Sequence, residues 1–155
     1  MADTAKPFNA RQVKVGNAVI KVMSRIQTWI YRTSKGRLGA KFLRGAPVCL
    51  VTTTGRTTGK ARTVPLLYMY DGDDIIIVAS KGGMPESPAW YSNIRANPEV
   101  DIEIGAKKVR HTCVTADSER RAELWPKLVA MYKDFEDYQA RTDRVIPVVV
   151  CSPVT

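Results

Sequence analysis

The sequence contains one histidine and three cysteines, and this scarcity excludes several kinds of site. Cys49, Cys113 and Cys151 are far apart, and each lies within a strand-like run. Together with His111 they offer neither the close spacing of metal ligands nor a nucleophile beside a base. We therefore expect buried, reduced thiols, a reducing compartment and no bound metal ion.

The sequence also lacks an apolar run long enough for a signal peptide or a membrane span, and it opens on small and polar residues. We therefore expect a cytoplasmic protein. With 155 residues, of which 45% are hydrophobic, the chain can bury a core of its own. We expect a flexible N-terminus over residues 1–12, a helix over 13–33 and one domain over 34–155.

Acidic residues are scarce in the first part of the chain. The first 62 residues contain 13 Lys and Arg but only one acidic residue, Asp3, whereas the remainder contains 11 basic and 14 acidic residues. This asymmetry fits a solvated basic surface, and it fits equally a polyanionic ligand, an anionic membrane surface or a nucleic acid as partner. Single-strand binders interleave aromatic residues with basic ones, and residues 55–62 contain no aromatic residue. We therefore expect no nucleic acid.

Residues 13–33 have the pattern of an amphipathic, cationic helix. Apolar residues recur at helical spacing and form one face, and four basic residues lie within about 20° of one line along the helix. Such a helix suits the headgroup region of an anionic membrane, although its apolar face suits packing on the domain equally well. The apolar residues are Val15, Val19, Val22, Ile26, Trp29 and Ile30, and the basic ones are Lys14, Lys21, Arg25 and Arg32.

Residues 51–83 form the centre of the pattern, with strands joined by a basic, glycine-rich turn. The turn Gly55–Lys60 has three residues between its glycines where a nucleotide-binding P-loop has four, and it leads into a strand, so we exclude nucleoside triphosphates. We expect its backbone amides to point at an anion beside three basic side chains, although a solvated hairpin tip has the same pattern. These basic residues are Arg56, Lys60 and Arg62.

The rest of the chain reads as strands and helices in alternation. Ile75–Val78 is a strand buried on both faces, Ser87 caps a helix that Pro88 begins, and residues 99–115 form two further strands. A helix from Asp117 or Ser118 is interrupted at Pro126, and Ile146–Cys151 is the closing strand. Two side-chain groups fit either a core or a pocket: Trp90, Asn93 and Asn97, and the stripe Leu128, Met131, Tyr132, Phe135 and Tyr138.

Several motifs in one order resemble the deazaflavin-dependent nitroreductase family of actinobacteria, over about residues 23–153. They are TTTGRTTGKARTVPLLY, VASKGG, PAWYSNIRANPEV, WPKLVAMY and TDRVIPVVVC. The resemblance implies an α+β fold, a split antiparallel β-barrel like the flavin-mononucleotide-binding barrels with flanking helices. It also implies the 8-hydroxy-5-deazaflavin cofactor, coenzyme F420, and transfer of a hydride from its reduced form to an electron-poor acceptor.

The resemblance assigns roles to individual residues. Those expected at the phosphate and polyglutamate tail of the cofactor are Arg56, Lys60, Arg62 and Lys81, with Thr57 where the best-known member has Lys. Those expected along the cofactor are Pro65, Ala79, Ser80, Trp90 and Asn93. Ser80 is expected near the reacting end, and Tyr132 and Tyr138 are expected to position the acceptor.

The sequence departs from the nitroreductase pattern at two positions in the acceptor pocket. Leu67 and Phe135 each stand where the resemblance implies Tyr. This change favours a quinone, such as a menaquinone, over a nitro-aromatic acceptor, and a membrane quinone gives the cationic helix a place on the inner face of the cell membrane. Two alternatives remain: a flavin mononucleotide-dependent enzyme of the same barrel and a non-catalytic deazaflavin-binding protein.

Overall fold

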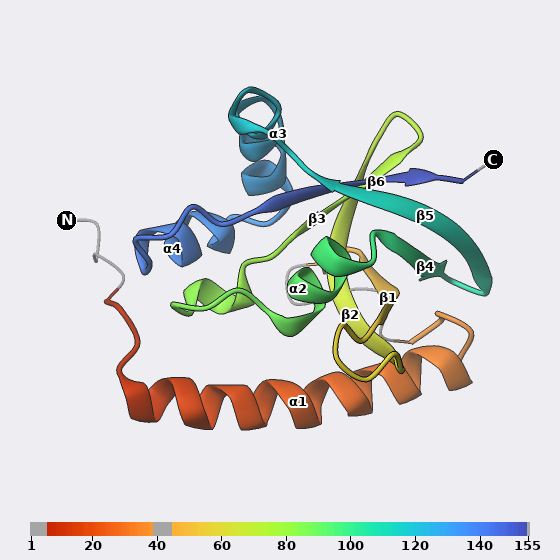
Figure 1. Cartoon of the computed structure of the whole chain (residues 1–155), viewed down its shortest axis with the longest axis horizontal. Helices are drawn as coiled ribbons and strands as arrows, with labels where there is room; N and C mark the ends of the chain where they lie inside the picture. Colours follow the sequence, from red (N-terminus) through yellow and green to blue (C-terminus); the bar gives the residue numbers. More distant parts are fainter. Residues whose placement is uncertain (1–5, 39–44, 155) are drawn as a thin grey trace.

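The computed structural model describes residues 6–38 and 45–154, which form a closed antiparallel barrel with helices around it (Figure 1). The strands, joined in the order β1-β2-β3-β6-β5-β4, confirm the expected α+β barrel. The strands are β1 (Val48–Thr54), β2 (Ala61–Asp71), β3 (Asp74–Val78), β4 (Glu99–Ile104), β5 (Lys107–Thr115) and β6 (Val148–Pro153). The helices are α1 (Ala10–Thr33), the short η2 (Lys81–Gly83), α2 (Ala89–Ala96), α3 (Ser118–Met131) and α4 (Asp134–Ala140).

Tight hairpins and two long-range pairings close the barrel. β1 pairs with β2 and also with β4, where Val51 lies opposite Ile102. β6 fills the gap between β3 and β5, so that Val150 lies opposite both Ile76 and Val114. The predicted closing strand is therefore confirmed, although it begins at residue 148 because residues 146–147 precede the ladder.

The core has two parts, one inside the barrel and one between the barrel and α3–α4. Ile77 and Ile102 belong to the inner cluster, and Ile76 and Leu128 belong to the outer one. The two faces of β3 thus contact different clusters, as its continuous apolar run predicted. The three cysteines are free, buried thiols, as expected, and burial raises the pKa of Cys49.

Helix α1 begins at Ala10, three residues before the predicted start. Asn9 accepts a hydrogen bond from the Gln12 amide, and the Gln12 side chain accepts one from the Asn9 amide, each at 2.9 Å. This capping box satisfies the first amides of the helix and so moves its start toward the N-terminus. Of the segment expected to be flexible, residues 10–12 are helical, and residues 1–5 lie outside the described part.

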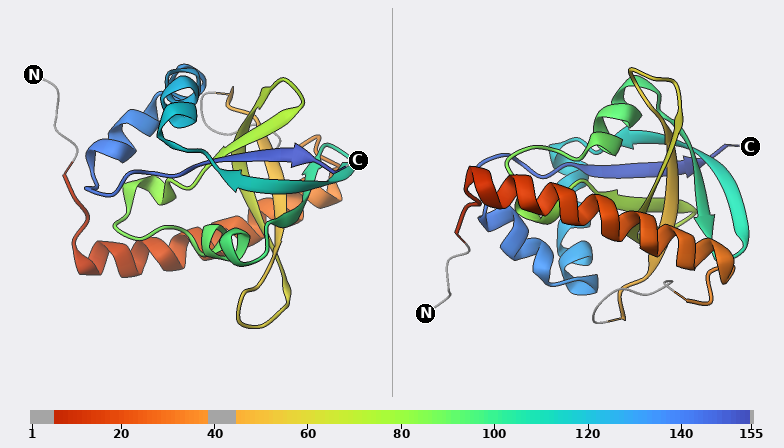
Figure 2. Two further views of the ribbon diagram at one scale, coloured as in Figure 1. Left: turned by 45° about the horizontal axis from the view of Figure 1, so that its top comes forward. Right: turned by 90° about the horizontal axis from the view of Figure 1, so that it is seen from below.

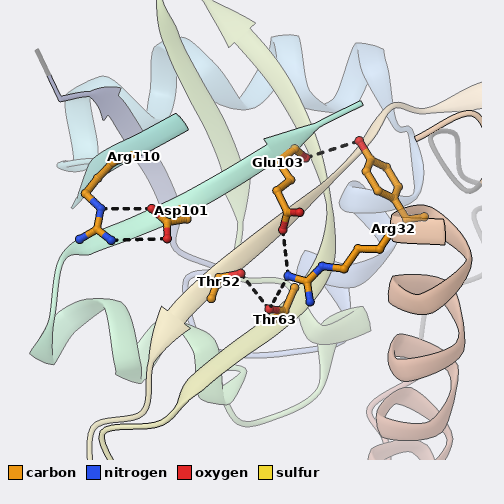
Figure 3. Close-up of polar contacts among 7 residues, drawn as sticks. Arg32, Thr52, Thr63, Asp101, Glu103 and Arg110 are labelled. Carbon is orange, nitrogen blue, oxygen red and sulfur yellow. Dashed lines mark hydrogen bonds and ion pairs between the residues drawn. The ribbon is translucent and has the colours of Figure 1, made fainter. Parts of the chain in front are cut away.

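The C-terminal end of α1 is fixed to the barrel (Figures 2 and 3). Tyr31 is buried, and its hydroxyl accepts a hydrogen bond from the Gly105 amide at 2.7 Å. Arg32 pairs with Glu103 at 2.9 Å and donates to Thr63 at 3.2 Å. Since Tyr31 is the only buried side chain of the helix, the attachment is strongest at this end.

The predicted apolar face of α1 points away from the barrel. Val15, Val19, Val22, Ile26 and Trp29 are between 48% and 68% exposed, so packing of this face on the domain, one of the two interpretations, is wrong. No described helix is both long and apolar enough to cross a membrane.

Two helix boundaries differ from the sequence prediction. α2 begins at Ala89, with Pro88 rather than Ser87 at the N-cap position and no side-chain cap. α3 runs through Pro126 without interruption, because its N-cap Asp117 and the buried Leu124 and Leu128 hold the helix on both sides of the proline. Between α1 and β1, residues 39–44 lie outside the described ranges.

Candidate functional site

A cavity of about 810 Å³ lies between α1 and the barrel. Its walls come from α1, the β1–β2 turn, the first half of β2, the segment from Val78 to Gly82, the start of α2 and the α3–α4 region. In Figures 1 and 2, α4 lies near the N-terminal end of α1, whereas β1 and β2 lie nearer its C-terminal end. This volume is typical of sites for cofactors and other ligands of drug size.

The β1–β2 turn is held in shape by its own backbone. The Gly55 amide donates to the Lys60 carbonyl, and the Gly59 amide donates to the Gly55 carbonyl, both at 2.8 Å. The Lys60 amide donates to the Thr58 hydroxyl at 3.3 Å. The expectation that the amides of this turn point at a ligand is therefore wrong for these three, and the turn presents mainly side chains to the cavity.

Asn93 joins this turn to α2 and β1. Its side chain is buried, donates to the Thr53 hydroxyl at 3.1 Å, and accepts from the Arg56 amide at 3.2 Å and from the Arg56 guanidinium at 3.1 Å. The carboxamide thus binds one neighbour with its NH₂ group and the other with its oxygen. Asn93 fixes both the backbone amide and the guanidinium group of Arg56 at the cavity wall.

The segment after β3 has three consecutive residues with positive φ: Lys81, Gly82 and Gly83. Arg144 holds this segment from the other side, since its guanidinium donates to the carbonyls of Ser80 at 2.9 Å, Met84 at 3.0 Å and Ala79 at 3.3 Å. The segment thereby places Ser80 and Lys81 in the cavity wall.

Aromatic side chains from the α3–α4 region form another part of the wall. The Tyr132 and Tyr138 hydroxyls are 3.2 Å apart, and the Phe135 ring lies edge-on to Tyr132 at 5.1 Å. Burial, followed by the hydrogen bond to Tyr138, raises the pKa of Tyr132. Both interpretations of this aromatic stripe therefore hold in part, because Tyr132 and Phe135 are buried in the outer core and also line the cavity.

The cavity brings together most of the residues predicted for the site. Two of them do not line it: Lys60, at the end of the turn, and Ala79, which is fully buried in the inner core. The predicted residues that do line it are Arg56, Thr57, Arg62, Pro65, Leu67, Ser80, Lys81, Trp90, Asn93, Tyr132, Phe135 and Tyr138.

Sequence reasoning missed the contribution of α1 to this wall. The polar side of the helix faces the cavity, and its apolar side, opposite on the helix, faces away. The sequence does indicate this side of the helix, because the α1 residues that line the cavity recur at spacings of three and four. The residues of α1 that line the cavity are Asn17, Ile20, Lys21, Ser24, Arg25 and Gln27.

The lining is cationic, since it includes Lys21, Arg25, Arg56, Arg62 and Lys81 but no acidic residue within the described part of the chain. Low-dielectric walls lined by one sign of charge concentrate ligands of the opposite sign. A cationic wall beside an aromatic one suits a ligand with an anionic part and a planar, apolar part.

The comparisons with known proteins agree with this site. The sequence model of the family described as F420H(2)-dependent quinone reductase matches residues 23–153. A protein of Mycobacterium tuberculosis named F420H(2)-dependent quinone reductase is 43% identical over 129 residues, which are 81% of this chain and 87% of the relative.

Solved structures show the same relationship. An F420-H2-dependent reductase is 40% identical with a TM-score of 0.64, over 68% of this chain and 94% of that one. A second structure, described as a domain-swapped dimer, is 36% identical with a TM-score of 0.67, over 83% of this chain and 96% of that one. The chain belongs to the F420H(2)-dependent quinone reductase family.

Proposed function

We propose that this protein transfers a hydride from reduced coenzyme F420 to a quinone. The observation that carries this proposal is a single cavity whose wall combines five cations and no described carboxylate with a cluster of aromatic side chains. Coenzyme F420 has the matching parts, a planar deazaflavin ring and a tail with a phosphate and glutamate carboxylates. The residues present therefore fit this cofactor, which supplies a hydride when it is bound in reduced form.

The cationic residues of the turn and of the segment after β3 are the proposed contacts of the cofactor's phosphate. Arg56 and Arg62 come from the β1–β2 hairpin, and Lys81 comes from the segment that Arg144 holds. Guanidinium groups bind phosphate through two parallel hydrogen bonds, which suits Arg56 once Asn93 has fixed it. Thr57 adds a hydroxyl, whereas Lys60 acts from outside the cavity wall.

The proposed ring contacts are Pro65, Trp90 and Ser80, with Ser80 nearest the reacting end. Reduction of a quinone by a hydride also requires a proton at the quinone oxygen. The raised pKa of Tyr132 keeps its phenol protonated, so Tyr132 and Tyr138 can donate hydrogen bonds to that oxygen. Burial of this aromatic cluster keeps water away from the transferred hydride.

The first test combines binding and turnover. We expect reduced F420 to bind and a soluble menaquinone analogue to reoxidise it, which restores the absorbance of the oxidised deazaflavin. Arg56→Gln should weaken binding about tenfold, because it removes a charge-assisted contact, and Tyr132→Phe should lower turnover with little effect on binding. Lys108→Gln, at an exposed lysine of β5 outside the cavity, is the control.

The alternatives give different results in the same assay. Absorbance changes with flavin mononucleotide and none with F420 would identify a flavin-dependent enzyme of this barrel. Binding of F420 without oxidation by any quinone would identify a non-catalytic deazaflavin-binding protein.

A nitro-aromatic compound is the second acceptor class. Leu67 and Phe135 both line the cavity and make this part of its wall apolar, which favours a quinone. We expect weak reduction of a bicyclic nitroimidazole by the natural chain. Faster reduction of the nitroimidazole by Leu67→Tyr or Phe135→Tyr, at unchanged F420 affinity, would show that these positions determine which acceptor is reduced.

We also propose that the exposed apolar face of α1 docks on an anionic bilayer, where a quinone dissolves. Trp29 and Met23 on this face are 68% and 57% exposed, and the first 62 residues carry a large excess of positive charge. An apolar helix face near basic side chains binds at the headgroup boundary of anionic membranes. Such docking places the cavity next to the bilayer.

Vesicle sedimentation tests this placement. Binding to vesicles rich in an anionic lipid should fall by about a hundredfold or more when Val22 and Ile26 are both replaced by Ser, because two buried aliphatic side chains are lost. Val114→Ser, at an exposed valine on β5, should bind like the natural chain. Unchanged binding of the double variant would contradict the proposal. A natural chain that sediments as a dimer, together with a double variant that sediments as a monomer, would assign this face to a second copy instead.

A further inference from the structure

Two cations of α1, Lys21 and Arg25, line the cavity although they lie far in sequence from the β1–β2 turn. They are four residues apart, so their side chains leave the same face of the helix one turn apart. Arg56 and Arg62 approach the same cavity from the barrel. The space between α1 and the hairpin is thus bordered by positive charge from two separate segments.

These charges have no anionic partner within residues 6–38 and 45–154, since no ion pair forms at Lys21, Arg25, Arg56, Arg62 or Lys81. Three other arginines, by contrast, have carboxylate partners: Arg120 with Asp71 and, as Figure 3 shows, Arg32 with Glu103 and Arg110 with Asp101. Like charges around one cavity repel one another, and a bound anion of several charges removes this repulsion.

The anchored end of α1 sets the direction of both side chains. Tyr31 and Arg32 hold the helix to β2 and β4 through the contacts with Gly105, Thr63 and Glu103. Arg25 lies six residues before Tyr31 and Lys21 ten, which places them about 9 and 15 Å along the helix from this anchor. A rigid helix fixed at one end keeps the same face toward the barrel over this distance.

We propose that Lys21 and Arg25 bind the glutamate carboxylates of the F420 tail, which passes between α1 and the β1–β2 turn. The inference rests on the proposed function, and it extends the cofactor site from the barrel to the N-terminal helix. Arg56, Arg62 and Lys81 then hold the phosphate, while the two cations of α1 add affinity that grows with tail length.

An anionic lipid headgroup has similar chemistry, but the structure favours the tail. At 100° per residue, Val19 and Ile26 each lie about 160° around α1 from a cavity-lining residue, Asn17 and Ser24 respectively, and on average about 130° from Lys21 and Arg25. A bilayer that contacts the exposed apolar face therefore meets the back of the helix, whereas the two cations open into the cavity. The bilayer and the cofactor tail use different sides of α1.

Fluorescence titration of F420 with short and long glutamate tails tests the inference without turnover. The natural chain should bind the long tail more tightly. The double variant Lys21→Gln, Arg25→Gln should lose about tenfold in affinity for the long tail and little for the short one, which removes the dependence on tail length. Lys14→Gln, on the same line of α1 but outside the cavity, should behave like the natural chain.

Three results would overturn the inference. An unchanged dependence on tail length in the double variant would leave the proposed function standing without the role of α1. A loss of anionic-vesicle binding at unchanged tail affinity would assign the two cations to lipid. No binding of F420 to the natural chain would remove the proposed function as well, and urea unfolding of both variants checks that the fold is intact.

Discussion

At the scale of single residues, Asn93 is a buried side chain that joins three elements of the site. It is 5% exposed and makes three hydrogen bonds, two to Arg56 and one to Thr53. A buried amide of this kind stabilises the fold only while its partners remain in place, because each lost bond leaves a desolvated polar group. The same residue therefore links stability to the position of a proposed phosphate ligand.

Asn93→Ala should lower the free energy of unfolding by about 1–3 kcal/mol, because Thr53 and the Arg56 amide lose their partner. It should also weaken F420 binding, since Arg56 is no longer fixed. Urea unfolding measures the first effect and fluorescence titration the second. Asn97→Ala, at the exposed C-cap residue that follows α2, is the control. Equal effects of the two substitutions would contradict the prediction.

The site residues that could be predicted from the sequence are those that belong to a recognisable local motif. Arg56 and Arg62 flank a glycine-rich turn, so their common direction follows from the hairpin. Arg144 carries no such signature, because its partners are carbonyls about 60 residues earlier in the chain. Its role depends on the tertiary fold alone, and no pattern around residue 144 indicates it.

At the scale of elements, the segment containing η2 depends on two glycines with different surroundings. Gly82 and Gly83 have φ values of 63° and 81°, a region that other residues adopt at a cost. A Cβ at Gly83 would lie 2.5 Å from the Tyr138 carbonyl oxygen, whereas a Cβ at Gly82 would have no neighbour within 4 Å among the described residues. Gly83 therefore allows α4 to approach the cavity wall.

Gly83→Ala should destabilise the fold by about 1–3 kcal/mol and displace Lys81 and Tyr138 from each other, which weakens cofactor binding. Gly82→Ala should cost about 1 kcal/mol through the backbone alone and should leave binding nearly unchanged. Chemical denaturation of both variants measures the loss of stability, and cofactor titration of both measures the loss of affinity. Similar losses at both glycines would mean that the contact with α4 is unimportant.

Helix α1 shows that hydrophobic periodicity predicts a helix but not how the helix is oriented on the domain. The spacing of Val15, Val19 and Ile26 defines an apolar face but not the surface that this face contacts. In most helices of globular proteins such a face packs on the core, whereas here the polar face packs beside a cavity. The inversion follows from the anchor at Tyr31 and Arg32, whose partners lie on β2 and β4 and are invisible to a local pattern.

At the scale of the whole molecule, buried phenols determine how the fold responds to alkali. Burial raises the pKa of Tyr31 and Tyr132, and it raises the pKa of Tyr68 to about 12. An unfolded chain releases these protons near pH 10, while the folded chain keeps them. Their contribution is therefore complete below about pH 10 and is lost as the pH rises above it.

The drop in urea midpoint between about pH 8 and about pH 10.5 should be smaller for Tyr132→Phe than for the natural chain, because one buried phenol no longer favours the unfolded state at high pH. Tyr70→Phe, at a tyrosine 59% exposed, removes a phenol outside the core and serves as control. A drop in Tyr132→Phe as large as that of the natural chain would contradict this account.

Most strands were predictable because their patterns are local. Alternation identified β4, and a continuous apolar run identified β3. The order of strands around the barrel was not predictable from these patterns, since β1 pairs with β4 and β3 with β6 across long stretches of chain. The resemblance to a known family implied a split antiparallel barrel, but the order of its strands came from the structure alone.

The place of β6 has a consequence for synthesis on the ribosome. β6 pairs with both β3 and β5, and it is the last of the six strands to be translated. Until it emerges, β3 and β5 present open edges to the surrounding solution, and such edges pair readily with other nascent chains. The barrel can therefore close only after translation of residues 148–153, and the two strand edges stay open to mispairing until then.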